Sequence, residues 1–84
     1  MSFRESLKRF IQDNLAQERS LKIEDDFRLI EQGILDSMSM VELIGFIEQE
    51  SGLRVPDHEV VPDNFRTLSA IEDMVQRLRS GNRA

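Results

Sequence analysis

The chain has 84 residues, a formal net charge of −5 and no cysteine. Without cysteine there can be no disulfide, no thiol nucleophile and no cysteine-ligated metal. The length suits one small domain, which leaves little room for a deep catalytic pocket. The sequence shows no apolar signal segment and no apolar run long enough to cross a bilayer, so we expect a cytoplasmic protein without membrane insertion.

Negative charge is concentrated in the middle of the chain. Between Asp36 and Asp63 there are seven acidic residues and a single base, Arg54. This charge disfavours nucleic acid, whose phosphates need lysine and arginine. It favours partner proteins with basic docking surfaces, although an ordinary solvated face is also often acidic.

A first helix is expected over residues 3–16, because apolar residues recur there at helical spacing and polar residues fill the other side. The apolar positions are Phe3, Leu7, Phe10, Ile11 and Leu15. Ser2 and Glu5 form a capping-box pattern at the start of this helix.

Residues 18–36 show no sustained periodicity and predict a long loop. A short acidic run at 24–26 is followed by several apolar residues: Phe27, Leu29, Ile30, Ile34 and Leu35. These apolar residues indicate that the loop is held against the core.

A second helix is expected over residues 37–50, with an apolar stripe at Met40, Leu43, Ile44 and Ile47. Either Asp36 or Ser37 can cap its start, and Gly52 follows its end at a position typical of helix termination. Met38 and Val41 lie off the main stripe. They are either exposed apolar contacts or a widening of the core face.

The remaining chain predicts one short helical turn and one further helix. The turn spans residues 57–61 between two prolines, and Phe65 is expected to anchor the connection after it. Thr67 is expected to cap a helix over 68–79, beyond which residues 80–84 should fray. The resulting fold class is all-α, a small four-helix bundle with three longer helices and one short one.

Ser37 lies where the loop meets the second helix, and its hydroxyl has more than one possible use. Catalysis would need an activating base, and His58 is the only histidine, so a Ser37–His58 hydrolase is a remote hypothesis. Helix capping explains the residue without any function. A third interpretation is a covalently attached phosphate, which the unpaired N–H groups of a helix start would stabilise.

The motif around Ser37 resembles that of the acyl carrier protein family, which includes peptidyl and D-alanyl carriers. The motif residues are Gly33-Ile34-Leu35-Asp36-Ser37-Met38, followed by Val41-Glu42-Leu43. Further landmarks of the family follow in order: Gly52-Leu53-Arg54-Val55-Pro56-Asp57 and Phe65-Arg66-Thr67. The resemblance covers roughly residues 3–79, and the landmarks in this order are much more specific than Asp-Ser alone.

The resemblance implies a single carrier domain over residues 1–84, with an ordered core of about 3–79, a long loop between helices I and II and a short helix III. Ser37 would carry 4′-phosphopantetheine, transferred from coenzyme A by a phosphopantetheinyl transferase. Asp36 would assist recognition by that transferase and its metal. The family's docking positions correspond to Met38, Val41, Glu42 and Glu48 on helix II, with Glu59 on helix III.

The resemblance also implies a carrier with no catalysis of its own, most simply a monomer. The thiol of the arm would hold acyl or aminoacyl groups as thioesters. Its partners would be loading ligases or transferases and downstream synthases of fatty-acid, polyketide, peptide or related biosynthesis. Ser39 stands where fatty-acid carriers usually have an acidic residue, and Gly45 stands where a larger exposed apolar residue is frequent; these departures concern the cargo and not the attachment. Asp36-Ser37-Met38 followed by Val41-Glu42-Leu43 is somewhat more similar to D-alanyl and other aminoacyl carriers than to fatty-acid carriers. The alternative function is a plain helical interaction module in which Ser37 only caps the helix.

Overall fold

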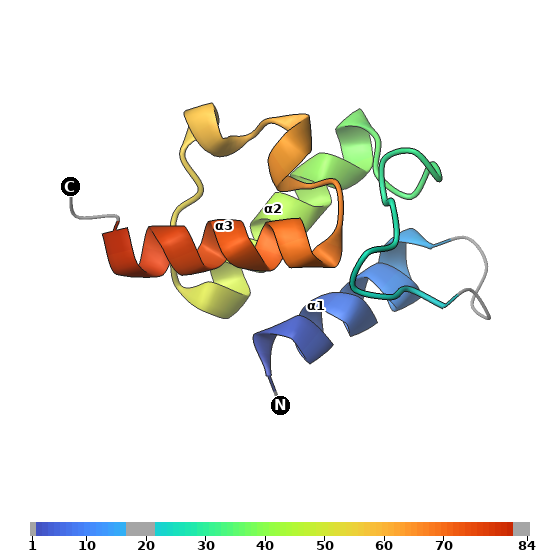
Figure 1. Cartoon of the computed structure of the whole chain (residues 1–84), viewed down its shortest axis with the longest axis horizontal. Coiled ribbons are helices and arrows are strands. Elements are labelled where there is room, and N and C mark those ends of the chain that lie inside the picture. The colour runs from blue at the N-terminus through green and yellow to red at the C-terminus, as the bar shows by residue number, and fades with distance from the viewer. Residues whose placement is uncertain (1, 17–21, 82–84) are drawn as a thin grey trace.

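A computed structural model describes residues 2–16 and 22–81, and these fold around three α-helices (Figure 1). The helices are α1 (Phe3–Phe10), α2 (Ser37–Ser51) and α3 (Leu68–Gly81). The described residues contain no strand, which confirms the all-α fold class. None of the described helices has the length and apolar character needed to span a membrane.

The short helical turn expected over residues 57–61 is present only in part and is not α-helical. Two 3₁₀ turns take its place, η2 (Asp57–Glu59) and η3 (Pro62–Asn64). The backbone leaves helical geometry at Val60, with φ −84° and ψ 76°, and Pro62 brings no N–H to continue a helix. The described chain is therefore a three-helix arrangement with a turn-rich connection rather than a four-helix bundle.

The first helix changes geometry halfway along its expected length. Ser2 caps α1, because its Oγ accepts a hydrogen bond from the Glu5 N–H at 3.2 Å. After Phe10 the helix widens into a π-helical turn, η1 (Ile11–Leu15), whose wider spacing is seen in the 2.8 Å bond from the Ala16 N–H to the Ile11 carbonyl. The expected loop from residue 18 begins in residues 17–21, which lie outside the described residues.

The loop before α2 is held against the core, as its apolar residues predict. Leu29 is fully buried, and its N–H donates to the Arg66 carbonyl at 2.8 Å. The Leu29 carbonyl in turn accepts hydrogen bonds from the N–H groups of Ile34 and Leu35 at 2.9 and 3.1 Å. Leu29 thus links the end of the loop to the segment before α3 through both its side chain and its backbone.

A charged contact on the surface joins three parts of the chain. The guanidinium of Arg4 in α1 pairs with Asp25 in the loop and with Glu72 in α3. The hydrogen bond to Glu72 is the main cause that raises the pKa of Arg4 above its ordinary value. The Asp25 backbone adds a second link, since its carbonyl accepts from the Ser69 N–H at 3.1 Å.

The core lies between α3, α2, α1 and the loop, and every buried side chain in the described residues is apolar. Phe65 is fully buried, which confirms its predicted role as an anchor. Thr67 caps α3 as predicted, since its Oγ1 accepts from the Ala70 N–H at 3.1 Å. The helix continues through Gly81, two residues beyond its expected end at residue 79, and 82–84 lie outside the described residues.

The fold predicts that Leu29 is a main anchor of the loop. We expect Leu29→Ala to lower the free energy of unfolding by about 2–5 kcal/mol, because it leaves a cavity in the core. Urea unfolding followed by circular dichroism measures the change. Gln32→Ala, at an exposed position of the same loop, is the control and should stay close to wild type. Equal stability of the two variants would contradict this role of Leu29.

Candidate functional site

The start of α2 is capped by Asp36, not by Ser37. Asp36 Oδ1 accepts hydrogen bonds from the Ser39 N–H at 2.9 Å and from the Ser39 hydroxyl at 2.8 Å. The Asp36 carbonyl accepts the first helical bond, from the Met40 N–H at 2.9 Å. Because the bond from the Ser39 N–H favours the charged carboxylate most, it is the leading cause that lowers the pKa of Asp36 below its ordinary value.

Ser37 is the first residue of α2, and its side chain is exposed. Among the residues that the structure describes, its hydroxyl has no hydrogen-bond partner. Asp36 already performs the capping for which a serine could otherwise be present. The structure therefore does not support the interpretation of Ser37 as a helix cap, and it leaves the hydroxyl open to a reagent from solution.

The turn before α2 fixes where this hydroxyl lies. Gly33 has a φ of 80°, a left-handed conformation that glycine adopts without strain. The two residues after it, Ile34 and Leu35, are buried in the core. Asp36 and Ser37 follow directly and are exposed, so the burial of Ile34 and Leu35 holds the pair at the surface.

The first turns of α2 also display apolar surface. The side chain of Met38 is 79% exposed and that of Val41 is 71% exposed, so neither of them widens the core face. Glu42, on the same turn as Val41, is exposed as well. Exposed apolar side chains beside an acidic one, next to the free hydroxyl, make a surface suited to a partner protein.

Glu48 and Glu59, two further candidates for partner contact, have intramolecular partners. Glu48 Oε2 accepts a hydrogen bond from the Val55 N–H at 2.8 Å, which ties the end of α2 to the connection after it. The Glu59 side chain is only 16% exposed. Its carboxylate accepts from Arg77 of α3 at 3.2 Å and from the Asn64 side chain at 2.8 Å.

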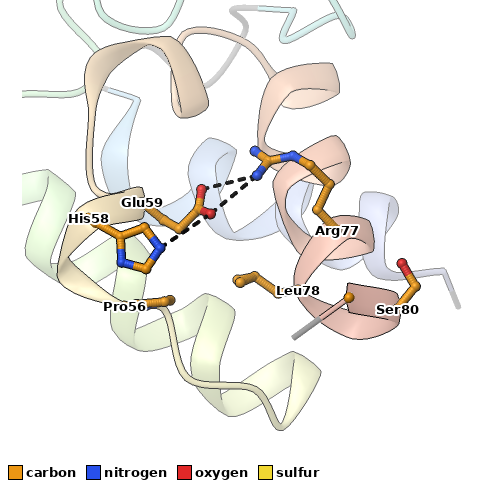
Figure 2. Close-up of a pocket in the computed structure, with 7 residues that line it drawn as sticks. Pro56, His58, Glu59, Arg77, Leu78 and Ser80 are labelled. Carbon is orange, nitrogen blue, oxygen red and sulfur yellow. Dashed lines mark hydrogen bonds and ion pairs between the residues drawn. The ribbon is translucent and has the colours of Figure 1, made fainter. Parts of the chain in front are cut away.

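Figure 2 shows His58 in the pocket beside this contact, with Pro56, Arg77 and Leu78 among the lining residues. The His58 ring lies 3.8 Å from the Glu59 carboxylate, and Ser37 does not line the pocket. A serine hydrolase built from Ser37 and His58 therefore finds no support in the described residues.

Sequence reasoning missed the second hydroxyl of the site, that of Ser39. The Ser39 hydroxyl donates a hydrogen bond to Asp36, three residues earlier at the start of the helix, and this is the spacing of a capping box. That spacing was present in the sequence, but a serine takes the place of the usual Glu or Gln of the pattern. The contacts of Arg77 with Glu59 and Asn64 had no local signal, because 18 and 13 residues separate the partners.

Comparison with known proteins finds similar sequences over most of this chain. A family model described as a phosphopantetheine attachment site matches residues 5–75. Aminoacyl carrier protein 2 of Bradyrhizobium diazoefficiens is 41% identical over 64 residues, which cover 75% of this chain and 71% of that protein. Acyl carrier protein AsbD of Bacillus anthracis is 32% identical over 80 residues, covering 90% and 88% respectively.

A solved structure shows the same likeness. In a crystal structure of the Bradyrhizobium japonicum glycine:[carrier protein] ligase complexed with glycylated carrier protein, one chain superposes with a TM-score of 0.69 and 27% identity. The alignment covers 87% of this chain and 99% of that one.

The cap predicts a pH-dependent contribution of Asp36 to stability. A carboxylate whose pKa is lower in the folded state stabilises fully above its unfolded-state pKa, about 3.9. That contribution is lost as the pH falls through the folded-state pKa. We therefore expect Asp36→Ala to be less stable than wild type at neutral pH and the difference to shrink below about pH 4.

Urea titrations of both proteins at several pH values measure this difference. Asp26→Ala is the control, because Asp26 is exposed and lies outside the cap. A difference between wild type and Asp36→Ala that stays constant from neutral to acidic pH would contradict the charged cap.

Proposed function

We propose that Ser37 is the residue to which 4′-phosphopantetheine is attached, because this chain belongs to the phosphopantetheine attachment-site family of carrier proteins. The assignment rests on the different roles of two neighbouring residues at the start of α2. Asp36 caps the helix, and the exposed Ser37 hydroxyl next to it makes no hydrogen bond within the described residues.

The residues at the start of α2 fit a phosphate ester. The first turn of a helix has N–H groups without intrahelical partners, and its dipole favours an anion. The position is open, since Ser37 and Met38 are both exposed. When attached, phosphopantetheine supplies a thiol that holds an acyl or aminoacyl group as a thioester.

We assign Asp36 a second role besides capping. Its carboxylate is ionised at neutral pH, as any carboxylate with an ordinary or lowered pKa is, and it is exposed beside the hydroxyl to be modified. An ionised carboxylate there suits recognition by a phosphopantetheinyl transferase that uses coenzyme A and a divalent metal. The carrier itself performs no catalysis in this scheme.

The partner surface begins with Met38, Val41 and Glu42. They provide two exposed apolar side chains and one exposed carboxylate within the first turns after Ser37. The sequence also predicts contacts at Glu48 and Glu59, whose carboxylates already have intramolecular partners. We therefore rest the docking proposal mainly on the first three residues, with a small interface that allows the carrier to leave each enzyme.

The cargo we propose is an aminoacyl group. Relatives of this chain include aminoacyl and D-alanyl carriers, and the solved neighbour is a glycylated carrier bound to its ligase. The partners would then be an aminoacyl-loading ligase and a downstream synthase, besides the phosphopantetheinyl transferase. We propose that the carrier works as a monomer in the cytoplasm.

The attachment site predicts a result for two neighbouring serines. Incubation with coenzyme A and a phosphopantetheinyl transferase should add one phosphopantetheine to wild type, seen as a gain in intact mass. We expect no gain for Ser37→Ala, because the accepting hydroxyl is missing. Ser39→Ala is the matched control on the same turn and should be modified. Full modification of Ser37→Ala would show that the attachment residue is wrong.

The docking surface predicts a separation of activity from stability. Met38→Ala should change the free energy of unfolding by less than about 0.5 kcal/mol, since the side chain is exposed. The same variant and Glu42→Lys should both slow the transferase reaction at low carrier concentration. Initial rates at low and high salt measure the effect, with Glu24→Lys, an exposed acid outside α2, as control. Rates for Glu42→Lys that match wild type at low salt would contradict electrostatic docking.

A further inference from the structure

A second surface lies along the line where α1 and η1 meet α2. Two adjoining hollows share Phe10, Asn14 and Phe46. One extends along α2 and is also lined by Glu42, Gly45 and Gln49. The other extends over α1 and is also lined by Ser6, Arg9, Asp13 and Glu50. Together they form one groove, here called the α1–α2 groove.

Two stacked aromatic rings form the middle of the groove. The ring centroids of Phe10 and Phe46 are 4.4 Å apart, with 15° between the ring planes. Both side chains are only half-buried, although they pack against the core. A half-exposed phenyl pair offers apolar surface to a bound side chain, and an aromatic ring attracts a cation toward its face.

Gly45 keeps the groove open on the α2 side. It is exposed in the interior of α2, where glycine is less stable than alanine. A Cβ built at this residue would meet nothing within 4 Å, and its φ is not positive. Neither packing nor backbone geometry therefore requires glycine here, whereas close approach of a bound group would.

The helix facing Gly45 is also irregular at this place. The π-helical turn η1 begins directly after Phe10, and the Asn14 amide donates to the Phe10 carbonyl at 3.1 Å. Such turns are costly in an α-helix and are often found at functional sites. The exposed glycine of α2 and the π-helical turn after α1 thus both lie at the α1–α2 groove.

The charges around the groove select its occupant. Among the described residues that line it, Asp13, Glu42 and Glu50 are exposed carboxylates and Arg9 is the one cation. The excess of negative charge favours a cation, and guanidinium suits the site better than ammonium because it stacks on aromatic rings and pairs with carboxylates. A second copy of this chain is disfavoured, because each copy has a net charge of −5.

We propose that the α1–α2 groove is a docking site for an arginine-bearing, partly apolar segment of a partner enzyme. The inference rests on the proposed function, because that enzyme is one that handles the carrier. Met38, Glu42, Gly45 and Gln49 follow one another at helical spacing on the exposed side of α2. A partner engaged at Ser37 can therefore continue along α2 into the groove, with arginine over the two rings.

The test is an NMR titration of the whole ¹⁵N-labelled chain with a short peptide that carries arginines flanked by leucines. A matched peptide with glutamates in place of arginines is the control. We expect shifts centred on Phe10, Asn14, Gly45 and Phe46 with the arginine peptide only. Gly45→Leu should raise the Kd about tenfold, because the added side chain fills the space above the rings. Gly81→Leu, the same change at an exposed glycine of α3, should leave the Kd unchanged.

Four results would overturn the proposal: no binding, equal binding of the glutamate peptide, shifts centred elsewhere, or equal affinity of the two leucine variants. Shifts in the groove on concentrating the protein alone would assign it to a second copy and would also overturn it. The titration needs no modification of Ser37, so Ser37→Ala should bind like wild type. If Ser37 is modified normally but the arginine peptide does not bind, only the groove proposal is contradicted. If the peptide binds but Ser37 is never modified, only the proposed function is contradicted.

Discussion

The hydrogen bonds between Asp36 and Ser39 are the contact on which the account of this site depends. Through them Asp36 caps α2 at the Ser39 N–H, so the helix needs no capping by the Ser37 hydroxyl. If Ser37 were itself the cap, its hydroxyl would accept a backbone N–H and would point back at the helix. In the structure it is instead an exposed hydroxyl at the positive end of a helix dipole, which is where a phosphate ester is best tolerated.

The core explains why the site stays in place without a large protein around it. The two residues before Asp36 are buried, and both donate backbone hydrogen bonds to Leu29, which itself bonds to the segment before α3. The long loop is thus held at its C-terminal end by the same core that packs the helices. A carrier needs such a fixed point, because its tether raises the effective concentration of cargo only where its base is well placed.

Much of this arrangement could be predicted from the sequence, because it depends on local signals. Apolar spacing located α2 and α3, and the residues Ser2, Thr67 and Gly52 marked helix ends that the structure confirms. The motif from Gly33 to Met38 indicated the candidate site. The widening of α1 after Phe10 had no comparable signal, since its apolar spacing continues as in an ordinary helix.

Other features of the structure could not be predicted from the sequence. The sequence could not decide which of Asp36 and Ser37 caps α2, since both residue types cap well. The helical turn predicted over residues 57–61 is a 3₁₀ turn that ends at Glu59, because the backbone leaves helical geometry at Val60. The sequence also could not show that Glu48 and Glu59 are engaged within the chain, because their partners, Val55 and Arg77, come from other segments.

The most direct test of the central claim is to locate the modification by tandem mass spectrometry. The chain is isolated after co-expression with an active phosphopantetheinyl transferase and then digested, and the modified peptide is fragmented between residues 36 and 40. The account predicts phosphopantetheine on Ser37 and an unmodified Ser39. Modification of Ser39, or a chain that stays unmodified while a known carrier in the same cells is modified, would contradict it.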